Sequence, residues 1–386
     1  MKKFIEKNSI FLHKTLNGLA DSLIKIFVPV IILKATQNIY LAILFMIIRP
    51  LTFVLFNLLL KKFLTKYPKL SIILHIIPIV ILQTIIFFVP INFFVIIILG
   101  VLSGLFTVFY TVPANLLFVF ADKKLNVSKM EIGTNLGKIL FIIIGGFIIN
   151  SGSLGYLITL TISASLIYVL SILPLIFGSK LLKVYRINTK RNIDIFDKKE
   201  KLIFNLFHLS FGSFQVFIDE ILPVFLFYNG LNFTAIATLQ AGVEVAKLLS
   251  NVLANFFYKK NLSKMSIIIA SGFFISSLIL FLVIKNNVMI YVLSTIVGVS
   301  FPLVFIPNFK MFCEHLIKKT YLIDEVSNRD FNIFIGRPFL VASYFVGFSF
   351  IAPFILAMMC SASLTIFSLK LFDYKENASQ IEMQAK

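Results

Sequence analysis

The first residues able to do chemistry are Asp21 and Lys25, which lie four residues apart in the otherwise apolar stretch NGLADSLIKIFVPVIIL (17–33). At that spacing the two charges share one face of a helix, with Asn17 one turn earlier. A charge at the centre of a bilayer costs at least about 2.5–3.5 kcal/mol. The pair could be an internal ion pair that holds the helix, or part of a site for a substrate or a coupling ion.

A second polar face occurs later, where His208, Gly212, Gln215 and Asp219 follow helical spacing and Glu220 adjoins Asp219. Two neighbouring carboxylates in a medium of low dielectric repel each other, which favours a proton on one of them. A proton-coupled carrier needs such a carboxylate. The alternative is that both acids pair with cations from other helices and do not titrate.

Arg49 and Glu244 are two further charges within apolar stretches. A guanidinium forms forked hydrogen bonds to carboxylate or phosphate, so Arg49 could hold an anionic part of a substrate, or it could neutralise Asp21. Glu244 lies three residues before Lys247, and these two could simply satisfy each other.

The composition shows which elements must carry these residues. Of the 386 residues, 59% are hydrophobic and 14% are charged, against about 25% charged in soluble domains. Apolar runs of about 20 residues, long enough to span a bilayer, recur along the chain. The pattern predicts an all-α polytopic membrane protein, and it lacks the alternation of an outer-membrane barrel.

The net charge of +19 does not indicate a nucleic-acid partner, because the excess Lys and Arg lie in short connections between apolar runs. We find no nucleotide-binding motif, metal-ligand cluster or nucleophile triad, so we expect no cofactor, no metal and no enzyme activity. Cys313 and Cys360 are isolated and give no disulfide framework.

The chain predicts twelve transmembrane helices. Their expected ranges are 15–33, 39–60, 70–89, 93–118, 133–150, 155–177, 203–228, 233–257, 265–284, 288–311, 332–349 and 352–372.

The connections alternate in charge. The basic ones include 61–69, 121–129, 258–264 and 314–330, together with the longest, 178–201. The positive-inside rule then places both termini in the cytoplasm of a multi-pass protein of the inner (plasma) membrane. The basic N-terminus lacks a cleavage site of small residues, so we expect a retained first helix and not a signal peptide.

The second half of the sequence weakly repeats the first, which indicates a duplicated six-helix unit. The predicted organisation is a bundle at 1–177, a basic cytoplasmic linker at 178–201, a bundle at 202–372 and a cytoplasmic tail at 373–386. The matches, at offsets of 194, 195 or 199, are FVPVIIL (27–33) with ILPVFLF (221–227), PKLSIIL (68–74) with SKMSIII (263–269), His13 with His208, Gly104 and Pro113 with Gly298 and Pro307, and GTNLGK (133–138) with NIFIGR (332–337).

Over roughly residues 10–372 the chain resembles a transporter of the major facilitator superfamily. The resemblance rests on six plus six spans, cytoplasmic termini, a central basic loop and two parallel halves. KKFLTKYPK (61–69) keeps the basic residues of the family's loop between spans 2 and 3 but not its Gly and Asp. FIIIGG (141–146) keeps only Gly145 and Gly146 of the fifth-span signature of many exporters.

The resemblance implies a central cavity lined by spans 1, 4, 7 and 10. At offsets of 194 and 195, Lys25 corresponds to Asp219 or Glu220, and Arg49 corresponds to Glu244 at 195. The first half therefore holds cations where the second holds acids. We expect Lys25 to face Asp219 or Glu220 across the cavity, in a bridge that breaks when access alternates.

The resulting prediction is a monomeric secondary carrier of a small molecule that works by alternating access, is coupled to protons, and contacts membrane lipids. Export is favoured over uptake. The alternatives are a flippase for a lipid or polysaccharide precursor, or a non-transporting protein that acts in sensing or assembly. Candidates for gating or kinking are Pro113, Pro223, Pro307, Gly145 and Gly146, whereas Lys138 and Arg337 are expected to reach water from helix starts.

Overall fold

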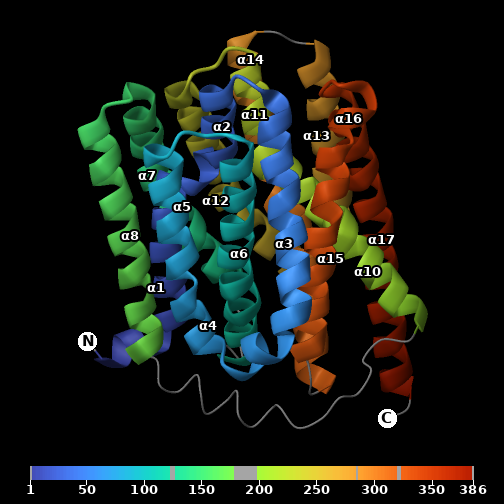
Figure 1. The fold of residues 1–386 in the computed structure, drawn as a ribbon. Coiled ribbons are helices and arrows are strands. Elements are labelled where there is room, and N and C mark those ends of the chain that lie inside the picture. Colours follow the sequence, from blue (N-terminus) through green and yellow to red (C-terminus); the bar gives the residue numbers. More distant parts are fainter. Residues whose placement is uncertain (1, 122–126, 178–197, 284–285, 320–322, 385–386) are drawn as a thin grey trace.

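The computed structural model describes residues 2–121, 127–177, 198–283, 286–319 and 323–384, and the described part is helical with no strands. The helices form an upright bundle with both termini at one end, hereafter the terminal end (Figure 1). Residues 178–197 of the predicted linker 178–201 lie outside the described residues. The predicted tail from 373 continues the last helix to Gln384.

Apart from the eleventh, each predicted span coincides with a helix or with a broken helix. The first-half elements are α1 (Lys2–Leu23), η1 (Lys25–Phe27), α2 (Val28–Thr36), α3 (Ile39–Lys66), α4 (Pro68–Leu74), α5 (Ile76–Phe88), α6 (Phe93–Ala121), α7 (Val127–Ser151) and α8 (Leu154–Phe177). The second-half elements are α10 (Lys198–Val216), η2 (Phe217–Ile221), α11 (Leu222–Tyr228), α12 (Phe233–Lys259), α13 (Ser263–Val283), α14 (Asn287–Lys319), α15 (Ile323–Ala342), α16 (Tyr344–Gly347) and α17 (Ile351–Gln384).

Nine of the described helices are long and apolar enough to cross a membrane, or ten if the bent pair Phe11–Leu23 and Lys25–Thr36 is one span. The other two predicted spans are α12 and α15, whose buried faces are polar. Gln240, Glu244 and Lys247 of α12 are at most 4% exposed. Since α12 packs against α7 and α15 packs against α3 and α10, the arrangement is consistent with the prediction of twelve.

The eleventh predicted span, 332–349, is displaced from the helix that the structure contains. Helix α15 already begins at Ile323 and ends at Ala342. Arg329 and Asp330, expected in a loop, are therefore helical and buried at 5% and 2% exposure. They neutralise each other at 3.3 Å, so burying them does not leave an isolated charge.

The internal repeat is visible in the closest helix contacts. Gly18 of α1 lies so near the Thr134 carbonyl of α7 that a Cβ would clash with it, and Gly212 of α10 meets the Ile333 carbonyl of α15 in the same way. Gly18 and Gly212 are 194 residues apart, and Thr134 and Ile333 are 199 apart, as in the sequence repeat. The first and fifth spans of each half therefore pack together through a glycine at the corresponding position.

A second glycine contact repeats as well. Gly104 of α6 packs against the Arg49 carbonyl of α3, and Gly298 of α14 packs against the Val243 carbonyl of α12. Both members of the second contact lie 194 residues after those of the first. These shared contacts support the two pseudo-symmetric bundles.

The first helix of each half is interrupted at the matching depth. Helix α1 gives way to the short 3₁₀ segment η1 at Lys25–Phe27, and α10 gives way to the π-helical segment η2 at Phe217–Ile221. Lys25 and Asp219 are again 194 residues apart. Each interruption therefore holds charged residues where the helical ladder is irregular.

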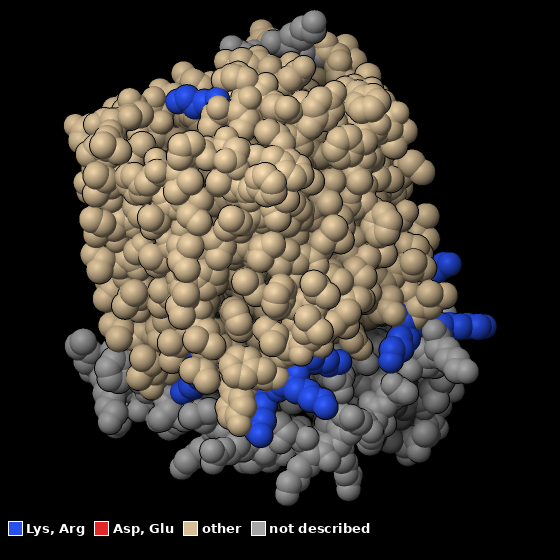
Figure 2. Space-filling model, in the orientation of Figure 1, with Lys and Arg blue, Asp and Glu red and all other residues tan. Residues whose placement is uncertain are grey.

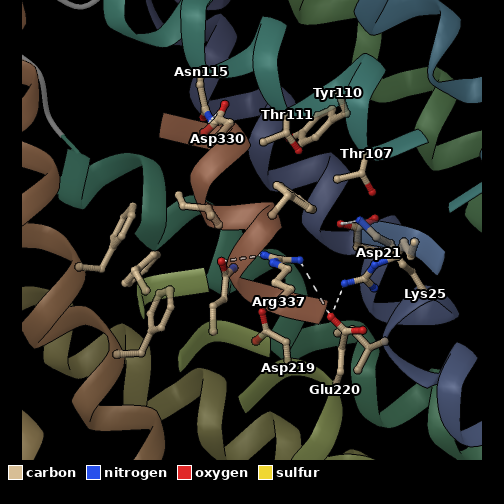
Figure 3. Close-up of a pocket in the computed structure, with 18 of the residues that line it drawn as sticks. Asp21, Lys25, Thr107, Tyr110, Thr111, Asn115, Asp219, Glu220, Asp330 and Arg337 are labelled. Carbon is tan, nitrogen blue, oxygen red and sulfur yellow. Dashed lines mark hydrogen bonds and ion pairs between the residues drawn. The ribbon is translucent and has the colours of Figure 1, made fainter. Parts of the chain in front are cut away.

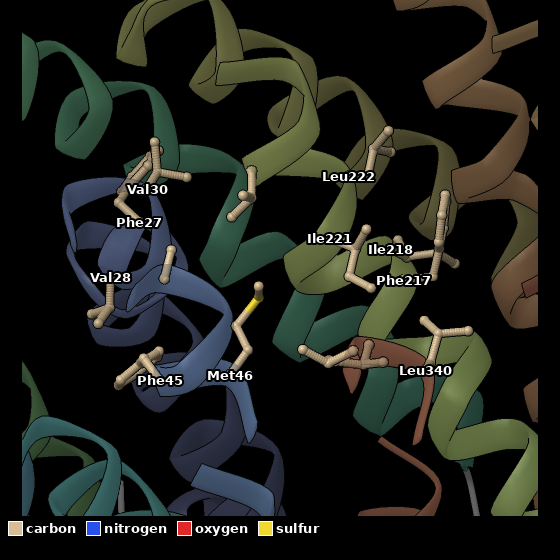
Figure 4. Packing of buried hydrophobic residues seen from close by; sticks show 14 of the residues in the cluster. Phe27, Val28, Val30, Phe45, Met46, Phe217, Ile218, Ile221, Leu222 and Leu340 are labelled. Atoms are coloured by element: carbon tan, nitrogen blue, oxygen red, sulfur yellow. The ribbon is translucent and has the colours of Figure 1, made fainter. Parts of the chain in front are cut away.

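Away from the terminal end, the two halves meet through a dry cluster that we call the apolar seal (Figure 4). Every member is at most 2% exposed, and α2 contacts α11 across the boundary between the halves. Its residues are Phe27, Val28, Val30, Phe45, Met46, Phe217, Ile218, Ile221, Leu222 and Leu340.

The outer surface matches a membrane protein. Figure 2 shows a broad band without Lys, Arg, Asp or Glu, with most of the blue side chains gathered towards the terminal end. Large apolar residues such as Leu59, Phe94 and Leu249 are more than 60% exposed on this surface. Lipid is the solvent that makes such exposure favourable.

Candidate functional site: a charged central cavity

A cavity of about 290 Å³ lies between the halves, on the terminal side of the apolar seal. Its walls come from α1, η1, α3, α6 and α7 of the first half and from α10, η2, α12, α14 and α15 of the second. All seven predicted substrate or coupling residues line it: Asp21, Lys25, Arg49, Gln215, Asp219, Glu220 and Glu244.

On the first-half side, Lys25 binds Asp21 at 3.1 Å. The Tyr168 hydroxyl donates to the other carboxylate oxygen of Asp21 at 2.5 Å. The Lys25 ammonium also lies 4.1 Å from the centre of the Phe106 ring. The expected bridge from Lys25 to Asp219 or Glu220 is therefore not the contact in this conformation, because the partner one turn away on the same helix is nearer.

Arg49 makes an ion pair across the halves instead. It donates to Oε1 of Glu220, and both side chains are at most 10% exposed. Arg337 of α15 approaches the same oxygen at 4.0 Å and donates to Gln215 Oε1 at 2.8 Å. Figure 3 shows Arg337 beside Glu220. Two arginines, Arg49 and Arg337, thus approach one carboxylate.

The π-helical segment η2 directs the two adjacent acids to different partners. Glu220 faces Arg49 and is 4% exposed, whereas the Asp219 side chain is 36% exposed and lies 3.5 Å from Lys247. π-Helical turns inside α-helices frequently occur at functional sites. These two ion pairs agree with the alternative that the acids pair with cations. The Asp219 side chain nevertheless remains partly exposed to the cavity.

A third group of charges surrounds α12. Lys247 binds Glu244 at 2.8 Å, and Lys138 of α7 approaches the same Glu244 oxygen at 3.6 Å. Lys138 and Arg337 thus line the cavity, and the expectation that they reach water from helix starts is wrong. Both are placed inward because acids of the opposite helices neutralise them there.

The terminal side of the cavity holds residues that the sequence reasoning missed. Asn115 of α6 donates to both carboxylate oxygens of Asp330 at 3.2 and 3.0 Å, and this contact joins the halves. Arg329 binds Asp330 and also lies over the Phe309 ring at 4.3 Å. The adjacent opposite charges were the available signal, but the predicted helix began after them.

The five gating candidates lie in helices. Pro113 and Pro307 lie inside α6 and α14, which continue past them, and Pro223 lies in the first turn of α11 directly after η2. Gly145 packs on the Leu23 backbone of α1, and Gly146 packs on α12 and Phe27. The two glycines therefore sit at helix contacts outside the cavity lining.

Several polar atoms at the cavity have no hydrogen-bond partner among the described residues. They include both donors and acceptors, in residues at most 8% exposed. The atoms are Arg49 Nε, Arg337 Nε, Gln240 Nε2, Glu220 Oε2 and Glu244 Oε2. Buried polar groups are normally satisfied, but these atoms are themselves buried, so a bound molecule reaches them only when their side chains move.

Within the described part of the chain, no three His, Cys, Asp or Glu side chains come together in a group that could hold a metal ion. The acids of the cavity instead face Lys, Arg or Asn.

A multi-pass helical bundle with an internal repeat and a charged cavity between its halves is the architecture of a membrane carrier. The sequence profile of the Major Facilitator Superfamily matches residues 10–321, and the chain belongs to this family. The family points to a transporter and not to an enzyme.

Solved structures with a similar fold come from a homologue of a transporter. Two solved structures of a bacterial homologue of the iron transporter ferroportin are similar, both outward-facing and one with soaked iron. The iron-soaked structure has a TM-score of 0.63 at 14% identity, covering 95% of this chain and 98% of that one. The other has a TM-score of 0.64 at 13% identity, covering 95% and 99%. No curated protein matches the sequence.

Proposed function

We propose that this transporter is a secondary carrier that moves a small molecule by alternating access and couples the movement to protons. The observation that carries the proposal is the Arg49–Glu220 ion pair, which joins the two halves between the cavity and the apolar seal. A buried pair between rigid bodies is stable in one arrangement and broken in another. It can therefore bias the equilibrium between two access states.

The proposed proton carriers are Asp219 and Glu220. They are adjacent acids in an irregular helical turn, where Glu220 faces Arg49 of the other half and Asp219 faces Lys247 of its own half. Protonation of Glu220 would release Arg49 and Arg337 together, because both approach the same oxygen. That step would link proton binding to separation of the halves.

The proposed direction is export. By the positive-inside rule, the terminal end with its basic connections faces the cytoplasm. The cavity lies on that side of the seal and would load from the cytoplasm. The proposed rigid units are residues 1–177 and 202–372 of a monomer in the plasma membrane.

The solved neighbours are described as homologues of an iron transporter, but we propose an organic substrate here. The identity of 13–14% carries the fold alone. The described part of this chain lacks a metal-binding group of three side chains, and the cavity wall combines aromatic rings with paired charges.

The test uses inside-out vesicles with an imposed proton gradient and a pH-sensitive dye. Amino acids, sugars, cationic drugs and lipid-like anions are added separately. We expect one class to dissipate the gradient with the wild type and not with Asp219→Asn/Glu220→Gln. Dissipation that is the same in the double variant would contradict the coupling role of these acids. If folded protein responds to none, proton-coupled exchange of these classes is wrong.

A further inference from the structure

Building on the proposed transport function, we infer that the substrate is a small zwitterion with an apolar body, such as an amino acid with an aromatic side chain. The inference comes from how charge, unused hydrogen-bonding atoms and aromatic rings are distributed over the cavity wall.

The lining carries both signs of charge in equal number. Lys25, Arg49, Lys138, Arg329 and Arg337 are the cations, and Asp21, Asp219, Glu220, Glu244 and Asp330 are the acids. A cavity built for a simple cation or a simple anion would show an excess of the opposite charge. Equal numbers favour a ligand that carries both.

The anionic end of the ligand fits the arginine cluster. Arg49 and Arg337 share one oxygen of Glu220, so these three side chains together carry a formal charge of +1. Nε of each arginine and the Gln240 amide nitrogen have no partner among the described residues, although all three atoms are buried in this conformation. Guanidinium groups bind carboxylates through paired hydrogen bonds, so a substrate carboxylate can neutralise the cluster.

The cationic end of the ligand fits Asp219 and Glu244. Asp219 is the most open acid of the cavity's ion pairs, with a side chain 36% exposed and its lysine as far away as 3.5 Å. Glu244 is bound by Lys247 at 2.8 Å and approached by Lys138 at 3.6 Å. An ammonium group donates three hydrogen bonds, so a ligand ammonium that displaces these lysines can use both acids.

The apolar body fits an aromatic wall. The Phe211 ring centroid lies 5.5 Å from those of Phe301 and Phe305, which are 5.6 Å from each other, and all three line the cavity. The volume of about 290 Å³ is at the small end of ligand pockets, which span about 300–1,000 Å³. These dimensions favour one side chain over an extended lipid or oligosaccharide.

The test is direct binding of three ligands that share one aromatic body: L-phenylalanine, its amide, and its N-acetyl derivative. At about pH 6, below the usual α-amino pKa of about 7.7–8.0, these are a zwitterion, a cation and an anion. We expect purified full-length protein to bind phenylalanine at least about tenfold more tightly than either analogue. Equal or tighter binding of an analogue, or binding of none, would overturn the inference.

Two variants test which residues bind the ammonium end and the carboxylate end of the ligand. Asp219→Asn should remove the preference for phenylalanine over the N-acetyl anion and keep the preference over the amide, whereas Arg337→Gln should do the reverse. The wild-type comparison remains decisive if either variant does not fold.

The binding assay separates this inference from the proposed function. If proteoliposomes exchange a cationic dye for protons while phenylalanine does not bind, the proposed carrier function is supported and the inference of a zwitterionic substrate is wrong. If phenylalanine binds with the expected selectivity but is not moved in counterflow, the site stands and transport of this ligand is wrong.

Discussion

The two ends of the interface between the halves differ sharply. The apolar seal joins them through tightly packed hydrocarbon, whereas the cavity joins them through polar contacts that include Arg49–Glu220, Lys138–Glu244 and Asn115–Asp330. Apolar contacts are non-directional and tolerate sliding. Hydrogen-bonded charges have defined partners that a proton or a ligand can replace. The comparison suggests that the apolar seal closes one side of the cavity, whereas the charged contacts of the cavity control when the halves separate.

Removing one partner of the Arg49–Glu220 pair should have the largest effect. Glu220 is approached by both Arg49 and Arg337, so removing it leaves two buried cations without their acid, and breaking a buried pair costs about 3–5 kcal/mol. We expect Glu220→Met to lower the thermal unfolding midpoint strongly and to abolish transport.

The double variant Arg49→Met/Glu220→Met should recover part of the midpoint, because only Arg337 then lacks its acid, but it should not recover transport. Asp373→Asn is the matched control, because its pair with Lys264 at 2.7 Å is exposed and is worth about 0–1 kcal/mol. If Glu220→Met and Asp373→Asn cost the same, the buried pair does not join the halves.

Truncating the seal should come next. Met46→Ala removes a side chain that is 1% exposed, and the resulting cavity should cost about 2–5 kcal/mol. The control is Met359→Ala, since Met359 is 61% exposed on α17. Unfolding of both variants in the same detergent measures the difference, and equal midpoints would mean that the seal is not packed as described.

The repeated glycine contact should be sensitive to a single methyl group. Gly212→Ala places a Cβ against the Ile333 carbonyl, and overpacking should cost about 1–3 kcal/mol. At Gly272 of α13 no atom lies within 4 Å of the added Cβ. We therefore expect Gly272→Ala to be neutral or stabilising by up to about 1 kcal/mol. An identical response of the two variants in unfolding experiments would contradict the close packing of α10 on α15.

The smallest effect is expected at the terminal side of the cavity. Asn115→Ala loses its hydrogen bonds to Asp330, at a cost of about 1 kcal/mol. Arg329 still neutralises Asp330, so folding should survive. A faster rate of labelling of cavity cysteines from the terminal side would show that this contact limits access. A rate unchanged from the wild type would show that it does not.

The fold could be predicted from the sequence because membrane spans are long and their composition is one-sided. The repeat was also readable, since matching helices keep matching glycines, as Gly18 and Gly212 do. Helix α15 was placed too late, because Arg329 and Asp330 resemble a loop when their partners are unknown. Their burial depends on each other and on Asn115, which is 215 residues away from Asp330.

Seven members of the cavity could be predicted, but their pairing could not. Charges in apolar spans have to face a wet or charged interior, which identified Asp21, Lys25, Arg49 and Glu220. The repeat suggested that Lys25 pairs across the cavity, yet Arg49 holds that position. Pairing depends on the depth and direction of each helix, and η1 and η2 alter both locally.

Cysteine labelling from each side of the membrane tests alternating access most directly. In a background without the two native cysteines, Thr111→Cys reports the cavity and Met46→Cys reports the seal. At rest we expect an impermeant maleimide to reach only Thr111→Cys, and only from the terminal side. With a proton gradient and a transported substrate, Met46→Cys should become reactive from the opposite side while Thr111→Cys becomes protected from the terminal side. Unchanged reactivity of both positions under all conditions would contradict a carrier that alternates between two open states.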